Sequence, residues 1–173
     1  MELHRSLNGA LAGTVGATAW AAQLPLDKRL FGSDYDDVEL LGKLVTRGDG
    51  WPAAGLALHL QNGALFGAAY ALARPFLPGP PLVSAVIASL AEHVASWPLT
   101  RLVDRHHPGR GDLSPLSGNR RAFAQATWRH LLFGMVMGEL ERRLNTPDEF
   151  EPPPVPISSN GHGNIEAAVG AQS

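Results

Sequence analysis

Five ionisable side chains lie well inside long, weakly charged stretches of this sequence, a placement that is costly if the stretches cross a membrane. Each lies about six to eight residues from the end of its stretch that adjoins residues 25–51 or 100–121, and a helix rises ~1.5 Å per residue. The five are therefore expected at one depth, about 9–12 Å below one surface, as a single polar layer. They are His59, Glu92, His93, Arg129 and His130.

The chemistry open to this layer ranges from an internal ion pair to a proton pathway. A charge at the centre of a membrane helix costs about 2.5–3.5 kcal/mol on insertion scales, so we expect Glu92 and Arg129 to face inward as direct neighbours. A purely structural pair would lock the helices together, with the histidines hydrogen-bonded to backbone or nearby polar groups. The functional interpretation is a proton relay, an ion pathway or a small-ligand site.

A metal or haem site is the weaker alternative. Two or three histidines can ligate zinc or haem iron, but the sequence contains no H-x-x-x-H pair and no C-x-x-C-H haem attachment. It also lacks G-x-S-x-G, H-E-x-x-H, P-loop and dinucleotide-binding motifs. We therefore predict that the chain is not an enzyme and holds no metal and no cofactor.

Four long stretches must position these residues, and they predict an all-α, four-helix transmembrane bundle. Each has about the length that crosses a ~30 Å hydrocarbon core. A soluble four-helix bundle is the alternative, but surface helices in water carry a polar face, and the first two stretches have almost no charged residue to form one. The predicted helices span about 7–24, 52–73, 81–99 and 122–141.

Small residues recur every four positions in these stretches and predict close helix packing. The pattern small-x-x-x-small lets two backbones approach, and residues at i, i+4 and i+8 lie along one stripe of a helix. Packing within the chain is the simpler interpretation, and homo-oligomerisation through an exposed stripe is the other. The glycines in question are Gly9, Gly13, Gly63, Gly67, Gly134 and Gly138.

An internal repeat accompanies the glycine pattern. His59-Leu60 precedes Gly63 and Gly67 at the same spacing at which His130-Leu131 precedes Gly134 and Gly138. The first and third stretches both end near a tryptophan, followed by Pro-Leu. The chain therefore resembles two copies of one helical hairpin.

The segments between the helices are polar. Residues 38–45 predict a short amphipathic helix, whereas 100–121 are expected to be irregular. The acidic cluster Asp34, Asp36, Asp37 and Glu39 is interpreted as a solvated helix N-terminus, capped by Ser33 or Asp34. The Pro-rich tail 146–173 is predicted to be disordered, which leaves one transmembrane domain over 1–145.

Composition narrows the class of protein further. The 173 residues include 14 Lys+Arg and 16 Asp+Glu, so there is no basic excess to indicate a nucleic-acid partner. Cysteine is absent, which excludes disulfides, thiolate metal sites and a cysteine nucleophile.

These patterns resemble those of the YagU-like bacterial inner-membrane proteins and their uncharacterised actinobacterial relatives. The resemblance covers about residues 7–145 and rests on Trp20 with Pro25-Leu26, on His59, on Ser96-Trp97-Pro98-Leu99, and on His130-Leu131 with Glu139-x-x-Arg142-Arg143. It implies a multi-pass protein of the bacterial inner membrane, without an assigned activity.

Three functional hypotheses follow. The first is a non-enzymatic membrane module that packs with itself, as a homo-oligomer, or with a membrane-protein partner, with the lipid bilayer around it. The second is proton-coupled or small-solute-coupled transport that uses the polar layer. The third is a soluble four-helix bundle.

Overall fold

The computed structural model describes residues 2–145, and every regular element in that range is helical. The all-helical prediction is thus confirmed for this part of the chain, whereas the expected disorder of 146–173 lies outside the described residues. The elements are α1 Glu2–Ala22, α2 Leu24–Phe31, α3 Asp37–Val45, α4 Trp51–Ala73, η1 Arg74–Phe76, α5 Pro81–Ser96, η2 Trp97–Leu99, α6 Thr100–His106 and α7 Arg120–Asn145.

Each of the four predicted long helices corresponds to one of α1, α4, α5 and α7, and the short helix predicted at 38–45 corresponds to α3. Two helices were not predicted. α2 follows α1 after a single residue and carries Pro25 in its first turn, where a proline without an N–H group is tolerated. The prediction of an irregular segment over 100–121 is wrong for its first part, because α6 continues the helical path of α5 and η2.

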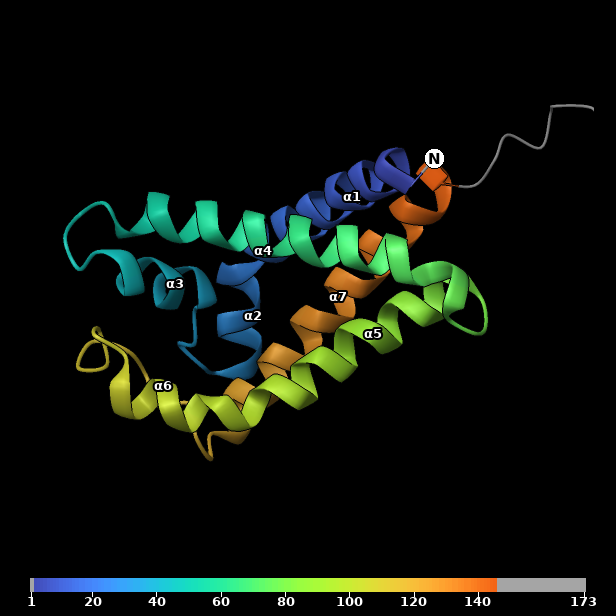
Figure 1. Cartoon of the computed structure of the whole chain (residues 1–173). Coiled ribbons are helices and arrows are strands. Elements are labelled where there is room, and N and C mark those ends of the chain that lie inside the picture. The colour runs from blue at the N-terminus through green and yellow to red at the C-terminus, as the bar shows by residue number, and fades with distance from the viewer. Residues whose placement is uncertain (1, 146–173) are drawn as a thin grey trace, which may run out of the picture.

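The long helices form a row in the order α4, α1, α7 and α5. α4 packs on α1, α1 packs on α7, and α7 packs on α5, whereas α4 and α5 make little contact with each other. Figure 1 shows α4 and α5 diverging from the turn that joins them, with α2 and α3 in the wide end of the V. α1 begins where α7 ends, since Asn8 donates a hydrogen bond to the Leu144 carbonyl (2.9 Å).

Glycines bring two of these helix pairs into backbone contact. A Cβ atom on Gly13 would lie 2.0 Å from the Gly63 carbonyl oxygen, and one on Gly67 would lie 2.1 Å from that of Gly9. Between α5 and α7, a Cβ atom on Gly138 would lie 2.4 Å from Ala85 Cβ. A larger residue at these positions would separate the helices, so the glycine stripes explain which helices pair.

The interior of this bundle contains several fully buried polar and charged side chains. Of the seven largest fully buried side chains within residues 2–145, only Met137 is apolar; the others are Arg129, His93, Gln125, Glu141, Asp27 and Ser89. Charged side chains are rarely buried completely unless they are paired.

Much of the outer surface is apolar. Four side chains spaced four residues apart form an exposed stripe along α1: Leu3, Leu7, Leu11 and Val15. Leu56, Leu65 and Leu72 are exposed on α4, and Ile87 and Val94 on α5.

Among the described residues, one helical stretch is long and apolar enough to cross a membrane. It is the run Pro81–His106, which joins α5, η2 and α6. The other long helices are rich in alanine and glycine, which are only weakly apolar, or carry several charges, as α7 does. The four-span bundle and the hairpin repeat therefore stay predictions, although α1 packs on α4 and α5 on α7, as two hairpins would.

Candidate functional site

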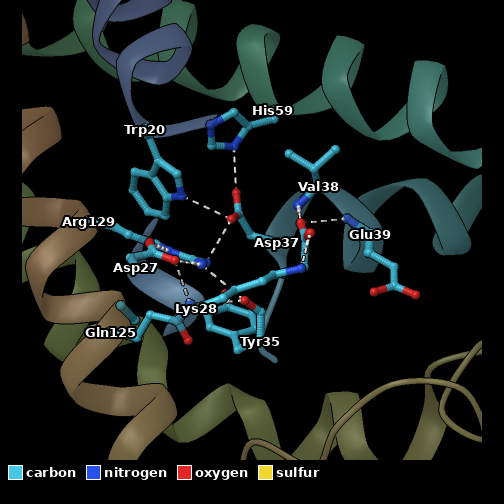
Figure 2. A network of polar contacts seen from close by, with 12 residues as sticks. Trp20, Asp27, Lys28, Tyr35, Asp37, Val38, Glu39, His59, Gln125 and Arg129 are labelled. Carbon is cyan, nitrogen blue, oxygen red and sulfur yellow. Dashed lines mark hydrogen bonds and ion pairs between the residues drawn. The ribbon is translucent and has the colours of Figure 1, made fainter. Parts of the chain in front are cut away.

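The centre of the molecule is an ion cluster built around Arg129 of α7, whose side chain is 0% exposed. The guanidinium contacts both carboxylate oxygens of Asp27: Nε donates to Oδ2 and Nη2 to Oδ1 (2.8 Å). Nη1 donates to Asp37 Oδ1 at 3.2 Å, and Nη2 also donates to the Tyr35 carbonyl at 3.0 Å. A two-pronged arginine–carboxylate contact is among the strongest polar pairs in proteins. Figure 2 shows Arg129 reaching Asp27 on one side and Asp37 on the other.

Local sequence explains how two acidic residues that are ten positions apart meet one arginine. α2 ends at Gly32, which has φ of 57°, a conformation that favours glycine. The Asp36 side chain then caps α3 by accepting from the backbone N–H groups of Val38 and Glu39 (3.0 and 3.1 Å), while Lys28 contacts its other oxygen at 2.7 Å. The turn and the cap together direct Asp37 inward.

Asp37 accepts hydrogen bonds from three helices. Trp20 Nε1 of α1 donates at 2.9 Å, His59 Nδ1 of α4 lies at 2.7 Å, and Arg129 of α7 completes the set. Burial alone would raise the pKa of Asp37, but the hydrogen bond and charge of His59 and the charge of Arg129 lower it below its usual value. The carboxylate is therefore ionised.

The Tyr35 hydroxyl beside this cluster has the opposite tendency. Its pKa is raised by burial and then by the negative charge of Asp37. Its ring also lies against the guanidinium of Arg129, 5.2 Å from centroid to Cζ. Tyr35 is therefore a neutral wall of the cluster.

His59 is held between two acceptors. Its Nδ1 faces Asp37 Oδ2 at 2.7 Å, and its Nε2 faces the Ala17 carbonyl oxygen at 3.1 Å. A carbonyl oxygen cannot donate, so both ring nitrogens must carry a proton if both contacts are hydrogen bonds. With His59 as an imidazolium, the cluster of Asp27, Asp37, His59 and Arg129 has two negative and two positive charges.

His130 repeats this arrangement with Glu92 of α5. Its Nδ1 faces the Ala126 carbonyl at 2.7 Å and its Nε2 faces Glu92 Oε2 at 3.0 Å, so it too is placed to donate from both nitrogens. His93 stacks on its ring with 4.6 Å between centroids. The Thr127 hydroxyl donates to Phe123, so His93 Nε2 donates to Thr127 (3.0 Å) and its Nδ1 needs no proton. A neutral His93 avoids stacking two charges.

Both histidine–carboxylate pairs line one cavity of about 480 Å³. The indole of Trp20 lies between the two imidazoles, with ring centroids 5.3 Å from His59 and 4.7 Å from His130. Both α4 and α5, which make little contact with each other, contribute residues to its lining. Its other lining residues include Tyr35, Asn62, Phe66, Ser89, Ser96 and Phe133.

The predicted direct contact between Glu92 and Arg129 is wrong. Arg129 binds Asp27 and Asp37, and Glu92 binds His130. The pairing was inferred from equal depth along the helices, but depth does not determine which face a side chain occupies. The Arg129 side chain reaches Asp27 of α2 and Asp37 of α3, whereas Glu92 lies on α5 in the lining of the cavity.

The five predicted residues divide between two parts of the site. His59, Glu92 and His130 line the cavity, Arg129 lies behind Asp37, and His93 backs His130. Asp27 and Asp37 were missed, and so was the role of Trp20. The assignment of Asp37 to a solvated helix N-terminus is wrong, because its side chain is buried; Asp36, rather than Ser33 or Asp34, is the cap. One signal for these contacts was present in the sequence. Residues 25–51 carry an excess of acidic side chains, and a buried Arg129 requires carboxylate partners.

Among the residues that the structure describes, no group of three or more His, Asp or Glu side chains is placed to hold a metal ion. The carboxylates are already engaged by arginine, tryptophan and histidine donors. The geometry instead allows two chemical events at the cavity wall: loss or gain of one proton by each histidine–carboxylate pair, and contact of a small solute with those pairs.

Comparison with known proteins finds no family, no curated protein and no solved structure that matches this chain. The resemblance to YagU-like inner-membrane proteins therefore stays a prediction.

Proposed function

We propose that this chain is an integral membrane protein that couples the movement of a small polar solute to protons, with the cavity between α4 and α5 as the solute site. The observation that carries the proposal is that two histidines, each held between a carboxylate and a backbone carbonyl, line the same cavity. Each pair stores one exchangeable proton at a position that a solute can reach.

Membrane placement is supported by the polarity of the molecule. A buried arginine cluster surrounded by exposed leucines is typical of proteins in lipid, where ionisable residues face the bundle interior and mark ion or substrate pathways. The stretch Pro81–His106 satisfies the length and apolarity needed for a span. The localisation that we propose is the bacterial inner membrane, with several spans.

A packing module, the first hypothesis from the sequence, explains less of this geometry. The six glycines of the predicted stripes all face other helices of the same chain. These stripes therefore pack against helices of the same chain and are not exposed to a second copy or a partner. A packing module also has no need for a cavity lined by two charged pairs.

The test is solute-driven proton movement across a membrane. The full chain is reconstituted in liposomes that contain a pH-sensitive dye, and amines, amino acids, carboxylates and sugars are added outside in turn. We expect at least one class to change the internal pH faster than in protein-free liposomes.

The double variant His59→Gln/His130→Gln should lose this change while it remains in the liposomes. If no class of solute exceeds the protein-free rate, or if the double variant behaves as the wild type does, proton-coupled transport is excluded.

A further inference from the structure

The Glu92 carboxylate is the charged group of the cavity that a solute can reach most easily. Its side chain is 46% exposed, whereas that of Asp37 is 11% exposed and is held by three donors. Its ion-pair partner is a histidine rather than a permanent cation. A histidine can give up its proton near neutral pH, so this pair can be opened without leaving a buried charge behind.

We propose that the cavity binds a small organic monocation, such as an alkylammonium ion, at Glu92, and that binding releases the proton held by His130. The inference rests on the proposed proton-linked solute site and names the chemical class of its solute.

The charges around the cavity favour a cation over an anion. Asp37 and Glu92 contribute two carboxylates to the lining, and they face His59 and His130, each placed to donate from both ring nitrogens. The permanent cation nearest Asp37, Arg129, is 0% exposed and is enclosed by Asp27, Asp37 and Tyr35, and among the described residues no lysine or arginine belongs to the cavity lining. An anion would therefore meet carboxylates without a reachable permanent positive charge, whereas a cation can replace an imidazolium.

The apolar part of the lining suits an organic cation rather than a bare metal ion. Trp20, Phe66 and Phe133 contribute aromatic side chains, and aromatic faces attract ammonium groups that have lost part of their hydration. A volume of about 480 Å³ accommodates a solute with several carbon atoms.

The exchange balances in charge and protons. Before binding, Glu92 is negative and His130 is positive, with Nε2–H donating to the carboxylate. The incoming ammonium group takes the place of that donor, and Nε2 of His130 releases its proton to the solvent. His130 then remains neutral with its Nδ1–H on the Ala126 carbonyl. One cation enters, one proton leaves, and the charge of the cavity is unchanged.

Other titratable groups face the Glu92–His130 pair from several helices and contribute to the electrostatic potential around it. His93 of α5 stacks on His130, and its charge would oppose that of His130. His59 of α4, Asp37 of α3 and Tyr35 from the segment before α3 lie across the cavity. α1 contributes Trp20, which does not titrate.

The experiment compares three solutes with the same carbon chain and different charge: n-butylammonium, n-butanol and n-butyrate. Binding to the full chain in detergent micelles is measured by calorimetry in two buffers that differ in ionisation heat. We expect n-butylammonium to bind with release of about one proton, and its affinity to rise with pH by up to about tenfold per unit. n-Butanol and n-butyrate should not release a proton.

Variants separate the roles of the two residues. Glu92→Gln should lose binding of n-butylammonium, whereas His130→Gln should bind it without proton release and without pH dependence. Glu2→Gln, an exposed change at the start of α1, should behave as the wild type. Circular dichroism of each variant verifies folding.

The inference is overturned if n-butyrate or n-butanol binds as well as n-butylammonium, if folded wild type does not bind n-butylammonium, or if Glu92→Gln binds it unchanged. Carboxylate-driven pH changes in the liposomes would uphold proton coupling and reject a cationic solute. Binding with proton release, but without any pH change in liposomes, would uphold the cation site and reject transport.

Discussion

At the scale of single residues, Arg129 has the largest structural role that the geometry assigns. Its charge is balanced by Asp27 and Asp37, which lie 102 and 92 residues away in the sequence. Burial of an ion pair is a weak source of net stability, but removal of one partner leaves charges without compensation. The cluster therefore links α2 and α3 to α7 through buried ion pairs.

Replacement of Arg129 by glutamine should destabilise the protein strongly. The Asp27 and Asp37 carboxylates would remain buried, with His59 against Asp37 alone, and loss of one partner of a buried pair costs about 3–5 kcal/mol. The free energy of unfolding, from denaturant titration in micelles, measures the effect. Asp27→Asn combined with Arg129→Gln restores the charge balance and should recover part of the loss.

The matched control is Arg143→Ala, because Arg143 forms an ion pair with Glu139 at 2.6 Å on the exposed face of the same helix. Exposed pairs contribute little to stability, because water and salt screen them. Equal effects at positions 129 and 143 would contradict the role assigned to the cluster.

At the scale of helices, the contact between α1 and α4 depends on backbones that touch. Gly9 and Gly13 of α1 face Gly63 and Gly67 of α4 with no room for a side chain on either helix. This contact also places Trp20 and His59 beside each other, since both lie further along the same two helix faces. The position of the cavity wall therefore follows from glycine packing.

Gly13→Ala should lower the thermal unfolding temperature. In an unpacked helix, glycine to alanine stabilises by up to about 1 kcal/mol, but here the new Cβ atom would lie 2.0 Å from the Gly63 carbonyl oxygen. Forcing the helices apart costs typically ~1–3 kcal/mol, so the sign of the effect is reversed. Gly111→Ala, with no atom within 4 Å of the added Cβ, should be nearly neutral. Stabilisation by Gly13→Ala would mean that the helices do not approach this closely.

At the scale of the whole molecule, the proposed placement in lipid rests on the distribution of polarity. The exposed stripe of Leu3, Leu7, Leu11 and Val15 on α1 would be an aggregation-prone surface in water and an ordinary one in lipid. The charged side chains of the interior do not face the surroundings, because they are paired with one another.

Val15→Lys should distinguish these surroundings. Val15 is exposed near the middle of α1, so in water the change is expected to be neutral within about 0.5 kcal/mol. In lipid, a lysine near the helix centre costs about 2.5–3.5 kcal/mol on insertion scales and should reduce the amount of protein in the membrane fraction. Leu3→Lys, near the helix end, should be tolerated because its side chain can reach the interface. Equal membrane yields for both variants would favour a soluble bundle.

The sequence by itself determined the helical class and the approximate limits of four long helices. It also singled out His59, Glu92 and His130 as members of a polar layer, and the structure places these three side chains in the lining of one cavity. These features depend on local signals, namely hydropathy, proline and glycine positions, and spacing along one helix. Such signals act within a few residues of the chain and can be read without knowledge of the partners.

Only the tertiary structure decided the ion pairs. Arg129 binds Asp27 and Asp37 rather than Glu92, because its side chain reaches α2 and α3, and Glu92 remains with His130 in the lining of the cavity. A charge pair has no sequence spacing of its own, since it forms between whichever faces the helices bring together. The inward direction of Asp37 is a tertiary feature too: the Gly32 turn and the Asp36 cap set the start of α3, and the packing of α3 on α4 brings Asp37 to His59.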